Sequence, residues 1–248
     1  MVNRLSVFLF ACLVFCLCCP AQSSGTMQLQ NAVCGVSVDV VASLQLKVFR
    51  PTYRSVDLVC GTMPTEADTS VIFCAAASFT GSLLDEFRHD NIMGPHVSGG
   101  KAYKGYGAGK HYGLFSATGN HWSISPLPNP DMIARVAAAG GMAFTQHWVI
   151  RHGEIYKPTT MSDLTRSYVY RVIANLHDTL CIIESTQVVS YGQFIQSLKT
   201  LGVTDALYMD MGAGWNYSFY RDEKGVFHRL HPRNSSSRYA TNWITFRK

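Results

Sequence analysis

Residues 206–220 read ALYMDMGAGWNYSFY, and the rest of the chain is best understood around this stretch. Apolar residues up to Met209 alternate in the manner of a β-strand that enters a core. The run ends on a single carboxylate, Asp210, and Gly212 and Gly214 follow it. Glycines there allow a tight turn and the close approach of a ligand to the backbone. A carboxylate at the end of a buried strand is a common place for chemistry in α/β-type folds, although an Asp in this position can also simply cap a turn.

Strand patterns dominate the chain on both sides of this stretch. They occupy residues 36–49, 56–60, 71–77, 114–125 (a hairpin), 142–151, 168–175, 179–184, 226–230 and 240–246. Helical patterns cover residues 129–139, with Asn129 as the cap, and a segment that Ser190 caps and Gly202 ends. Residues 83–88 are expected to form one helical turn. Many strands, few helices and no linker-like tract predict a single α+β domain with mixed and antiparallel sheets rather than a doubly wound fold.

The first 21 residues have the pattern of an export signal. A short basic start with Arg4 precedes an apolar run over residues 5–18, and small residues precede a cleavage point after Ala21. The run is too short to span a bilayer, so we expect no transmembrane span. We therefore expect a secreted or periplasmic protein whose domain covers residues 22–248. A lipoprotein anchored through Cys18 or Cys19 is the alternative.

Composition and charge exclude several classes of protein. The chain is 47% hydrophobic and 15% charged, which excludes a disordered protein. Without residues 1–21 the 21 basic residues fall to 20 against 16 acidic ones, a net charge of +4. These charges form no run, so the sequence does not predict nucleic-acid binding, while a mild positive charge suits an anionic substrate.

Cysteine usage gives expectations about disulfides and metals. Four of the eight cysteines remain after residue 21: Cys34, Cys60, Cys74 and Cys181. No CxxC pair exists, so no structural zinc site is predicted. In an oxidising compartment these cysteines could form up to two disulfides, and we expect Cys60 to pair with Cys74, because both lie in strand patterns that could be neighbours. Cys181 has the pattern of a buried apolar residue.

Residues 92–113 are rich in glycine and contain His96, Lys101 and His111. The segment GYGAGKH, residues 105–111, departs from the phosphate-loop pattern, because its first glycine is misplaced and His111 stands where Ser or Thr is required. The chain also lacks a histidine metal signature, a serine-hydrolase elbow and a dinucleotide fingerprint, so we expect no metal and no cofactor. An irregular loop whose cations meet an anionic ligand is the remaining interpretation.

Arg171 lies among apolar residues of a predicted strand. A buried arginine must be paired, either with a carboxylate or with an anionic ligand. Glu184, at the end of the following strand, and Asp210 are the carboxylates that the sequence places nearest to it.

Taken in order, these pieces resemble the phosphodiester glycosidase family. The resemblance is carried by the strand RVIA (residues 171–174), IIES (182–185), the helix with its leucine-glycine end, the strand that closes on Asp210, and TNWITF (241–246). It is similar to a divergent branch of secreted bacterial members, because Met211 and Ala213 replace two glycines of the family motif and Trp215 replaces a serine. The family's asparagine is also missing from AAASF, residues 75–79.

The resemblance implies an enzyme that hydrolyses a sugar-1-phosphodiester in glycan or exopolysaccharide metabolism. In that interpretation Asp210 is the acid/base or sugar-orienting carboxylate, Arg171 holds the phosphate, and Glu184 is a second carboxylate. Residues expected to contact the substrate are Asn216, Gly212, Gly214, His96, Lys101 and His111. Two alternatives remain: a non-catalytic glycan-binding protein that uses its tryptophans and tyrosines, and a hydrolase of a peptidoglycan-type or teichoic-type polymer.

Overall fold

Antiparallel strands are the main regular elements of the computed structural model, which describes residues 33–127, 130–157 and 164–248. The predicted signal peptide and the predicted cap Asn129 lie outside the described residues. Within them the chain forms 18 strands, two α-helices and three 3-10 helices, and every pair of strands is antiparallel. The predicted α+β fold is confirmed. No helix in this part of the chain is long and apolar enough to cross a membrane.

The strands form one large sheet, one smaller sheet and a two-stranded ribbon. The large sheet has the order β1-β2-β13-β12-β15-β9-β5-β6, and β7, β8 and β10 extend it beside β9. Its strands are β1 (Gly35–Val41), β2 (Leu46–Thr52), β5 (His96–Ser98), β6 (Lys101–Tyr103), β7 (Tyr112–Thr118), β8 (His121–Pro126), β9 (Met142–Arg151), β10 (Glu154–Ile155), β12 (Arg171–Leu176), β13 (Thr179–Ser185) and β15 (Val203–Tyr208). The smaller sheet has the order β17-β16-β4-β18-β3. Its strands are β3 (Ser55–Cys60), β4 (Val71–Ala76), β16 (Ser218–Arg221), β17 (Phe227–His231) and β18 (Asn242–Arg247). The ribbon pairs β11 (Ser167–Tyr168) with β14 (Val189–Ser190).

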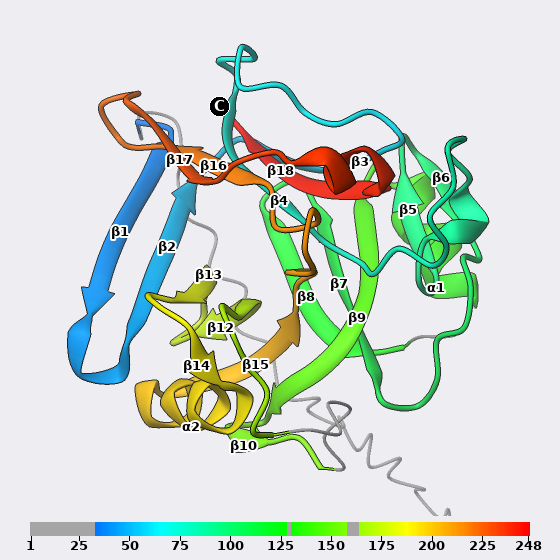
Figure 1. The fold of residues 1–248 in the computed structure, drawn as a ribbon. Helices are drawn as coiled ribbons and strands as arrows, with labels where there is room; N and C mark the ends of the chain where they lie inside the picture. Colours follow the sequence, from blue (N-terminus) through cyan, green and yellow to red (C-terminus); the bar gives the residue numbers. More distant parts are fainter. Residues whose placement is uncertain (1–32, 128–129, 158–163) are drawn as a thin grey trace, which may run out of the picture.

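The large sheet is the middle layer of the molecule. Its strands β12, β13 and β15 lie between helix α2 (Tyr191–Leu201) on one side and the smaller sheet on the other (Figure 1). Ile173 and Leu207 face the core that is shared with the smaller sheet, whereas Val172 and Tyr208 face the core under α2. Helix α1 (Pro130–Ala138) covers the β5–β7–β9 region through Ile133. Alternate residues of one strand thus serve two cores.

Helix α2 forms where the sequence predicted it. The side chain of Ser190 accepts a hydrogen bond from the backbone of Gln193, and the Gln193 side chain accepts one from the backbone of Ser190. This capping box satisfies donors that the first helical turn leaves free. Gly202 ends the helix with φ 88°, a left-handed conformation that favours glycine. Phe194 and Leu198 bury the inner face against the large sheet.

Most predicted strands and hairpins are present, and one predicted element is wrong. β12 and β13 are joined by His177 and Asp178, both with positive φ, and Gly119 turns the β7–β8 hairpin. The helical turn expected over residues 83–88 is not formed. The segment is held as a loop instead, because Asn91 binds the backbone of Gly81 and Ser82 at the point where the loop begins. One helical turn has too few internal hydrogen bonds to compete with such contacts.

The disulfide expected between Cys60 and Cys74 is also wrong. Cys60 lies on β3 and Cys74 on β4, but the last strand, β18, inserts between these two strands. Asn242 of β18 is opposite Cys60, and Thr245 of β18 is opposite Cys74. The cysteines are therefore two strands apart, beyond the reach of a disulfide. All four described cysteines are free thiols, and Cys181 is buried as expected.

Candidate functional site

Asp210 lies just beyond the end of β15, near the middle of the large sheet. β15 runs between β12, which begins at Arg171, and β9, which contains His147. The backbone N–H of Asp210 donates to the carbonyl of Ala77, directly after β4, at 3.1 Å. The site predicted from the sequence is thus the place where three strands of the large sheet meet the end of a strand of the smaller one (Figure 1).

The carboxylate of Asp210 is buried and is held by backbone groups. Its Oδ1 accepts a hydrogen bond from the N–H of Gly212 at 3.0 Å, and the N–H groups of Thr80 and Met211 also donate to it. In the described part of the chain no cation forms an ion pair with it. Burial raises the pKa of Asp210 to about 6, because the backbone donors offset only part of the cost of removing the charge from water. A carboxyl group with this pKa can accept or donate a proton near neutral pH.

Aromatic side chains surround the end of β15. Phe79 packs against Tyr208 and His147, with ring centroids 5.6 Å and 5.4 Å away, and Tyr112 lies 4.1 Å from the His147 ring. Burial, Tyr112 and Asp210 together raise the pKa of Tyr106, so this ring of the glycine-rich loop is within electrostatic range of Asp210. Tyr106 of the glycine-rich loop therefore lies close to Asp210.

His147, on β9, is a further candidate residue, which the sequence did not indicate. Burial, helped by His111, lowers the pKa of His147 to about 4, so the ring is neutral at physiological pH. Its Nδ1 is buried and has no hydrogen-bond partner among the described residues. A buried, unpartnered ring nitrogen marks a point where a ligand hydroxyl would be accepted. Only the pairing of β9 with β7 and β15 brings His147 to this place, so no spacing in the sequence indicated it.

Arg171 begins a second part of the site on the neighbouring strand. It is 0% exposed and lies directly opposite Glu184 in the β12–β13 pair. Its Nε donates to Oε2 of Glu184 at 2.7 Å, and its Nη2 donates to Oγ of Ser218 at 2.7 Å. Its Nη1 is buried and has no partner among the described residues. The predicted pairing of Arg171 with Glu184 is thus present, and one guanidinium nitrogen remains for another acceptor.

Glu184 connects this arginine to two residues of the smaller sheet. Burial opposes the ionisation of Glu184, but Arg171 and His231 outweigh it, so the pKa of Glu184 is lowered. Its Oε1 lies 3.0 Å from Nε2 of His231, and Nδ1 of His231 lies 3.4 Å from Nδ2 of Asn216. The structure therefore joins Asn216 to Arg171 and Glu184 through His231, which the sequence analysis did not single out. Among the described residues no hydrogen bond or ion pair links Asp210 to Arg171 or Glu184.

The three cations expected from the glycine-rich loop separate in the structure. His111 lies near His147, and its Nδ1 is 3.5 Å from the hydroxyl of Tyr156. His96 is fully buried at the start of β5 and contacts His89. Lys101 is exposed on β6, at the edge of the large sheet. The expectation that His96 and Lys101 complete one site with His111 is corrected, because the β5–β6 hairpin carries them to the sheet edge.

The two glycines after Asp210 differ. Gly214 has φ 94°, and a Cβ there would lie 2.5 Å from Cβ of Ser236, so the backbone itself requires glycine. At Gly212 the nearest atom to an added Cβ would be Oδ1 of Asp210 at 3.4 Å, an ordinary contact. Trp148 and Trp243 are buried in the cores, which removes them from the surface on which a sugar could stack.

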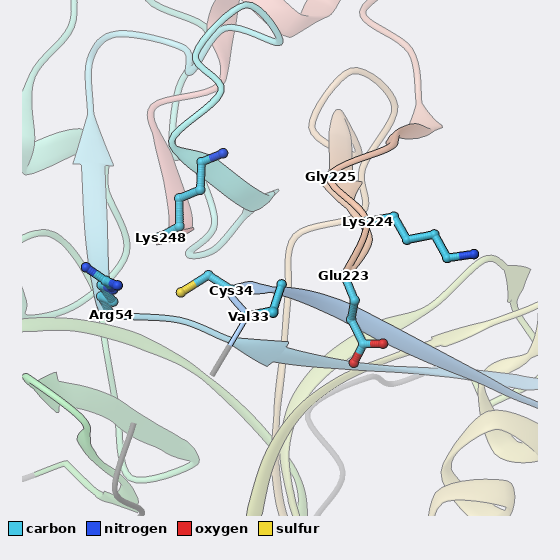
Figure 2. A pocket seen from close by; sticks show the side chains of 7 residues that line it. All are labelled: Val33, Cys34, Arg54, Glu223, Lys224, Gly225 and Lys248. Atoms are coloured by element: carbon cyan, nitrogen blue, oxygen red, sulfur yellow. The ribbon is translucent and has the colours of Figure 1, made fainter. Parts of the chain in front are cut away.

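Two surface cavities are lined by other residues. One, of about 530 Å³, is lined by Val33, Cys34, Arg54, Glu223, Lys224, Gly225 and Lys248 (Figure 2). The other, of about 520 Å³, is lined by Thr65, Glu66, Ala67, Arg229, Pro232 and Arg233. Neither contains a residue that the sequence predicted for the site. The chemistry-bearing residues are buried at the junction of the sheets instead.

Comparisons with known proteins support the fold. No protein-family model and no curated protein sequence matches the chain. Among solved structures, the chain is similar to the catalytic domain of zebrafish N-acetylglucosamine-1-phosphodiester alpha-N-acetylglucosaminidase, auto-inhibited by its pro-peptide, with a TM-score of 0.56 and 14% identity over 92% of this chain and 86% of that one. A hypothetical protein from Synechocystis aligns with a TM-score of 0.41 and 12% identity, over 86% of this chain and 61% of that one. The first likeness shows a distantly shared fold.

Proposed function

We propose that this protein is an exported hydrolase that cleaves sugar-1-phosphodiesters, with Asp210 and Arg171 as its central residues. One observation carries the proposal: the buried carboxyl group of Asp210 follows β15, and the neighbouring strand β12 begins with the buried guanidinium of Arg171, whose Nη1 has no partner among the described residues. An acid/base group beside a cation is the pair that this reaction needs. The distant fold similarity to a phosphodiester glycosidase supports the same reaction class.

The chemistry assigns different tasks to the two groups. Water adds across the bond between the anomeric carbon and the phosphate oxygen, so the sugar gains a hydroxyl and a phosphate monoester leaves. The leaving group is an anion, and Arg171 would stabilise its charge through Nη1. Above pH 6 Asp210 is mostly ionised and would accept the proton of the attacking water. His147, neutral and unpartnered at Nδ1, would accept a hydroxyl of the sugar.

Glu184 then acts through Arg171 rather than on the substrate. It is bonded to Nε of Arg171 and to the His231 ring, so both its oxygens already have partners. This arrangement fixes the guanidinium with Nη1 as the nitrogen left for a phosphate. Asn216 is the next residue of this network, and its side chain would move with the His231 ring that it contacts. We therefore propose Glu184 as a positioning residue and not as a second acid.

A panel of sugar-1-phosphodiesters tests the proposal. The wild type is compared with Asp210→Asn, which keeps an oxygen that can accept from Gly212, and with Arg171→Lys, which keeps a cation opposite Glu184. Asp178→Asn, in the exposed β12–β13 turn, is the control. We expect hydrolysis of at least one substrate, a loss of about 100-fold or more in Asp210→Asn, and unchanged activity in the control. Full activity in both site variants, with native circular dichroism, would rule the assignment out.

The burial of Arg171, Glu184 and Asp210 favours a second candidate function. All three side chains lie inside the molecule, and the two cavities described above lie elsewhere. Such an arrangement also suits a non-catalytic glycan-binding protein that retains the fold. Calorimetric binding of a sugar phosphate without turnover, unaffected by Asp210→Asn, would support this candidate against the hydrolase.

Export is the remaining part of the proposal. It rests on the apolar run and the small residues before position 22. Amino-terminal sequencing of the protein recovered outside the cytoplasm is expected to begin at Gln22. A chain that retains Met1 would contradict cleavage there.

A further inference from the structure

Three side chains from separate elements meet beside the smaller sheet. Cys60 ends β3, His89 begins the 3-10 helix η2 (His89–Asn91), and His96 begins β5. The sulfur of Cys60 and one ring nitrogen of each histidine all lie within 4.8 Å of one another. Nδ1 of His89 is 3.1 Å from Nε2 of His96. None of these residues has a role in the function proposed above.

The hydrogen bonds of His96 fix the direction of its lone pair. Its Nδ1 lies 3.1 Å from the carbonyl oxygen of Gly94, which can only accept, so the ring proton is on Nδ1. Nε2 therefore carries a lone pair toward His89, whose Nδ1–H donates to it in the metal-free protein. When a metal takes that place, the proton shifts to the other ring nitrogen of His89. A carbonyl that holds the far nitrogen of a histidine is the usual support for a metal-binding ring. Adjacent nitrogens on a tetrahedral zinc ion, each about 2.0–2.1 Å from the metal, are roughly 3.3 Å apart, close to the separation seen here.

The surroundings hold the two rings in place. His89 stacks on Tyr103 with centroids 3.4 Å apart and meets the edge of Phe87 at 4.9 Å. The Phe87 ring in turn occupies the space where a Cβ at Gly61 would lie, next to Cys60. His96 is fully buried, while Cys60 and His89 are partly exposed. The cluster is thus rigid on its inner side and accessible to water on its outer side.

We propose that Cys60, His89 and His96 form a three-ligand site for Zn²⁺, with water as the fourth ligand. One thiolate and two imidazoles suit zinc, whereas magnesium and calcium require oxygen ligands that the cluster lacks. The sequence predicted no metal because these three ligands do not lie close together in one segment. These ligands come from three elements, and the fold alone assembles them.

Metal binding at this site releases a proton. Burial raises the pKa of the Cys60 thiol to about 11, so the thiol is protonated before the ion binds. Zinc forms its bond to the sulfur as the S–H bond gives up its proton to solvent, and no oxidation occurs. Burial lowers the pKa of His96 to about 4, so Nε2 is already unprotonated at neutral pH.

Zinc would also restrict the motion of the exposed loop between Cys60 and His89. The segment between Cys60 and His89 contains Leu83, Leu84 and Phe87, which are 62%, 38% and 38% exposed. An ion bound to both Cys60 and His89 closes this loop, and His96 anchors it to β5. Loop closure by a metal restricts the open states that a protease needs.

Titration of chelator-treated protein that begins at Gln22 tests the site, because the four cysteines before that position would bind the same metals. Co²⁺ serves as the optical probe, calorimetry measures Zn²⁺ binding, and Cu²⁺ is titrated in parallel. We expect one zinc ion per chain and a thiolate-to-cobalt charge-transfer band that Cys60→Ser removes and Cys34→Ser, the control at another free thiol, retains. His89→Phe, which preserves the stacking on Tyr103, should also abolish stoichiometric binding.

Trypsin cleavage after Arg88 gives a readout that does not depend on spectroscopy. With free zinc at 100 times its Kd, linkage predicts cleavage about 100-fold slower than in the chelated protein. Trypsin should cleave the Cys60→Ser variant at the rate of the chelated wild type, with or without zinc. Absence of stoichiometric zinc, a cobalt band that survives Cys60→Ser, or tight binding of copper alone would each overturn the zinc assignment.

Discussion

Replacing Asp210 with asparagine is predicted to make the folded protein more stable at alkaline pH. Burial raises the pKa of Asp210 from 3.8 to about 6 in the folded state. Each pKa unit corresponds to about 1.4 kcal/mol, so ionisation costs the folded state about 3 kcal/mol more than the unfolded chain. Because the folded state holds this proton more tightly, the wild type loses stability as pH rises from about 4 to 6. Asparagine has no charge at any pH and avoids this cost.

Urea denaturation at several pH values measures the effect. We expect Asp210→Asn to match the wild type near pH 3 and to exceed it by up to about 3 kcal/mol at pH 8. Asp178→Asn, at an exposed turn position with positive φ that asparagine also adopts, should give a difference that does not change with pH. If Asp210→Asn is less stable at pH 8, the ionised carboxylate is a favourable turn cap, and our account of its pKa and of its role as a base fails.

Three further predictions concern the surroundings of the site. Gly214→Ala should lower the free energy of unfolding by about 1–3 kcal/mol, because Gly214 has a positive φ and no space for a Cβ. Gly212→Ala should change it by no more than about 1 kcal/mol, and urea denaturation measures both variants. Glu184→Ala should lower the free energy of unfolding by about 3–5 kcal/mol, since it removes the carboxylate that pairs with the buried Arg171. Glu184→Gln should lower it by less in the same assay. Ser190→Ala should lower stability by about 1 kcal/mol in thermal melts through loss of the α2 cap, and an unchanged melting temperature would contradict that role.

Local patterns predicted most of the secondary structure. Helix α2 forms because its cap, apolar face and terminal glycine all lie within one short segment. The β12–β13 and β7–β8 hairpins form for the same reason, since each turn and its two strands are contiguous. The helical turn expected over residues 83–88 failed because Asn91, outside the segment, holds the loop that contains it.

The candidate site was predicted in part. Arg171 and Glu184 were placed together because they lie on two consecutive strands of a predicted hairpin, where pairing follows from the turn. His231 and Ser218 were missed, since they reach Arg171 and Glu184 from the smaller sheet. His96 was assigned to another group, because its side chain contacts His89 and Tyr103, which the fold brings to it from other segments.

The sequence by itself determined the α+β class, the two helices, and a buried strand that closes on Asp210. Those properties depend on periodicity, capping and glycine positions within short segments. Only the tertiary structure decided which distant residues lie together: β18 lies between Cys60 and Cys74, His147 lies beside Phe79 and Tyr112, and Cys60 lies with His89 and His96. The order in which strands join a sheet is set by burial of the whole chain, and no short segment contains that information.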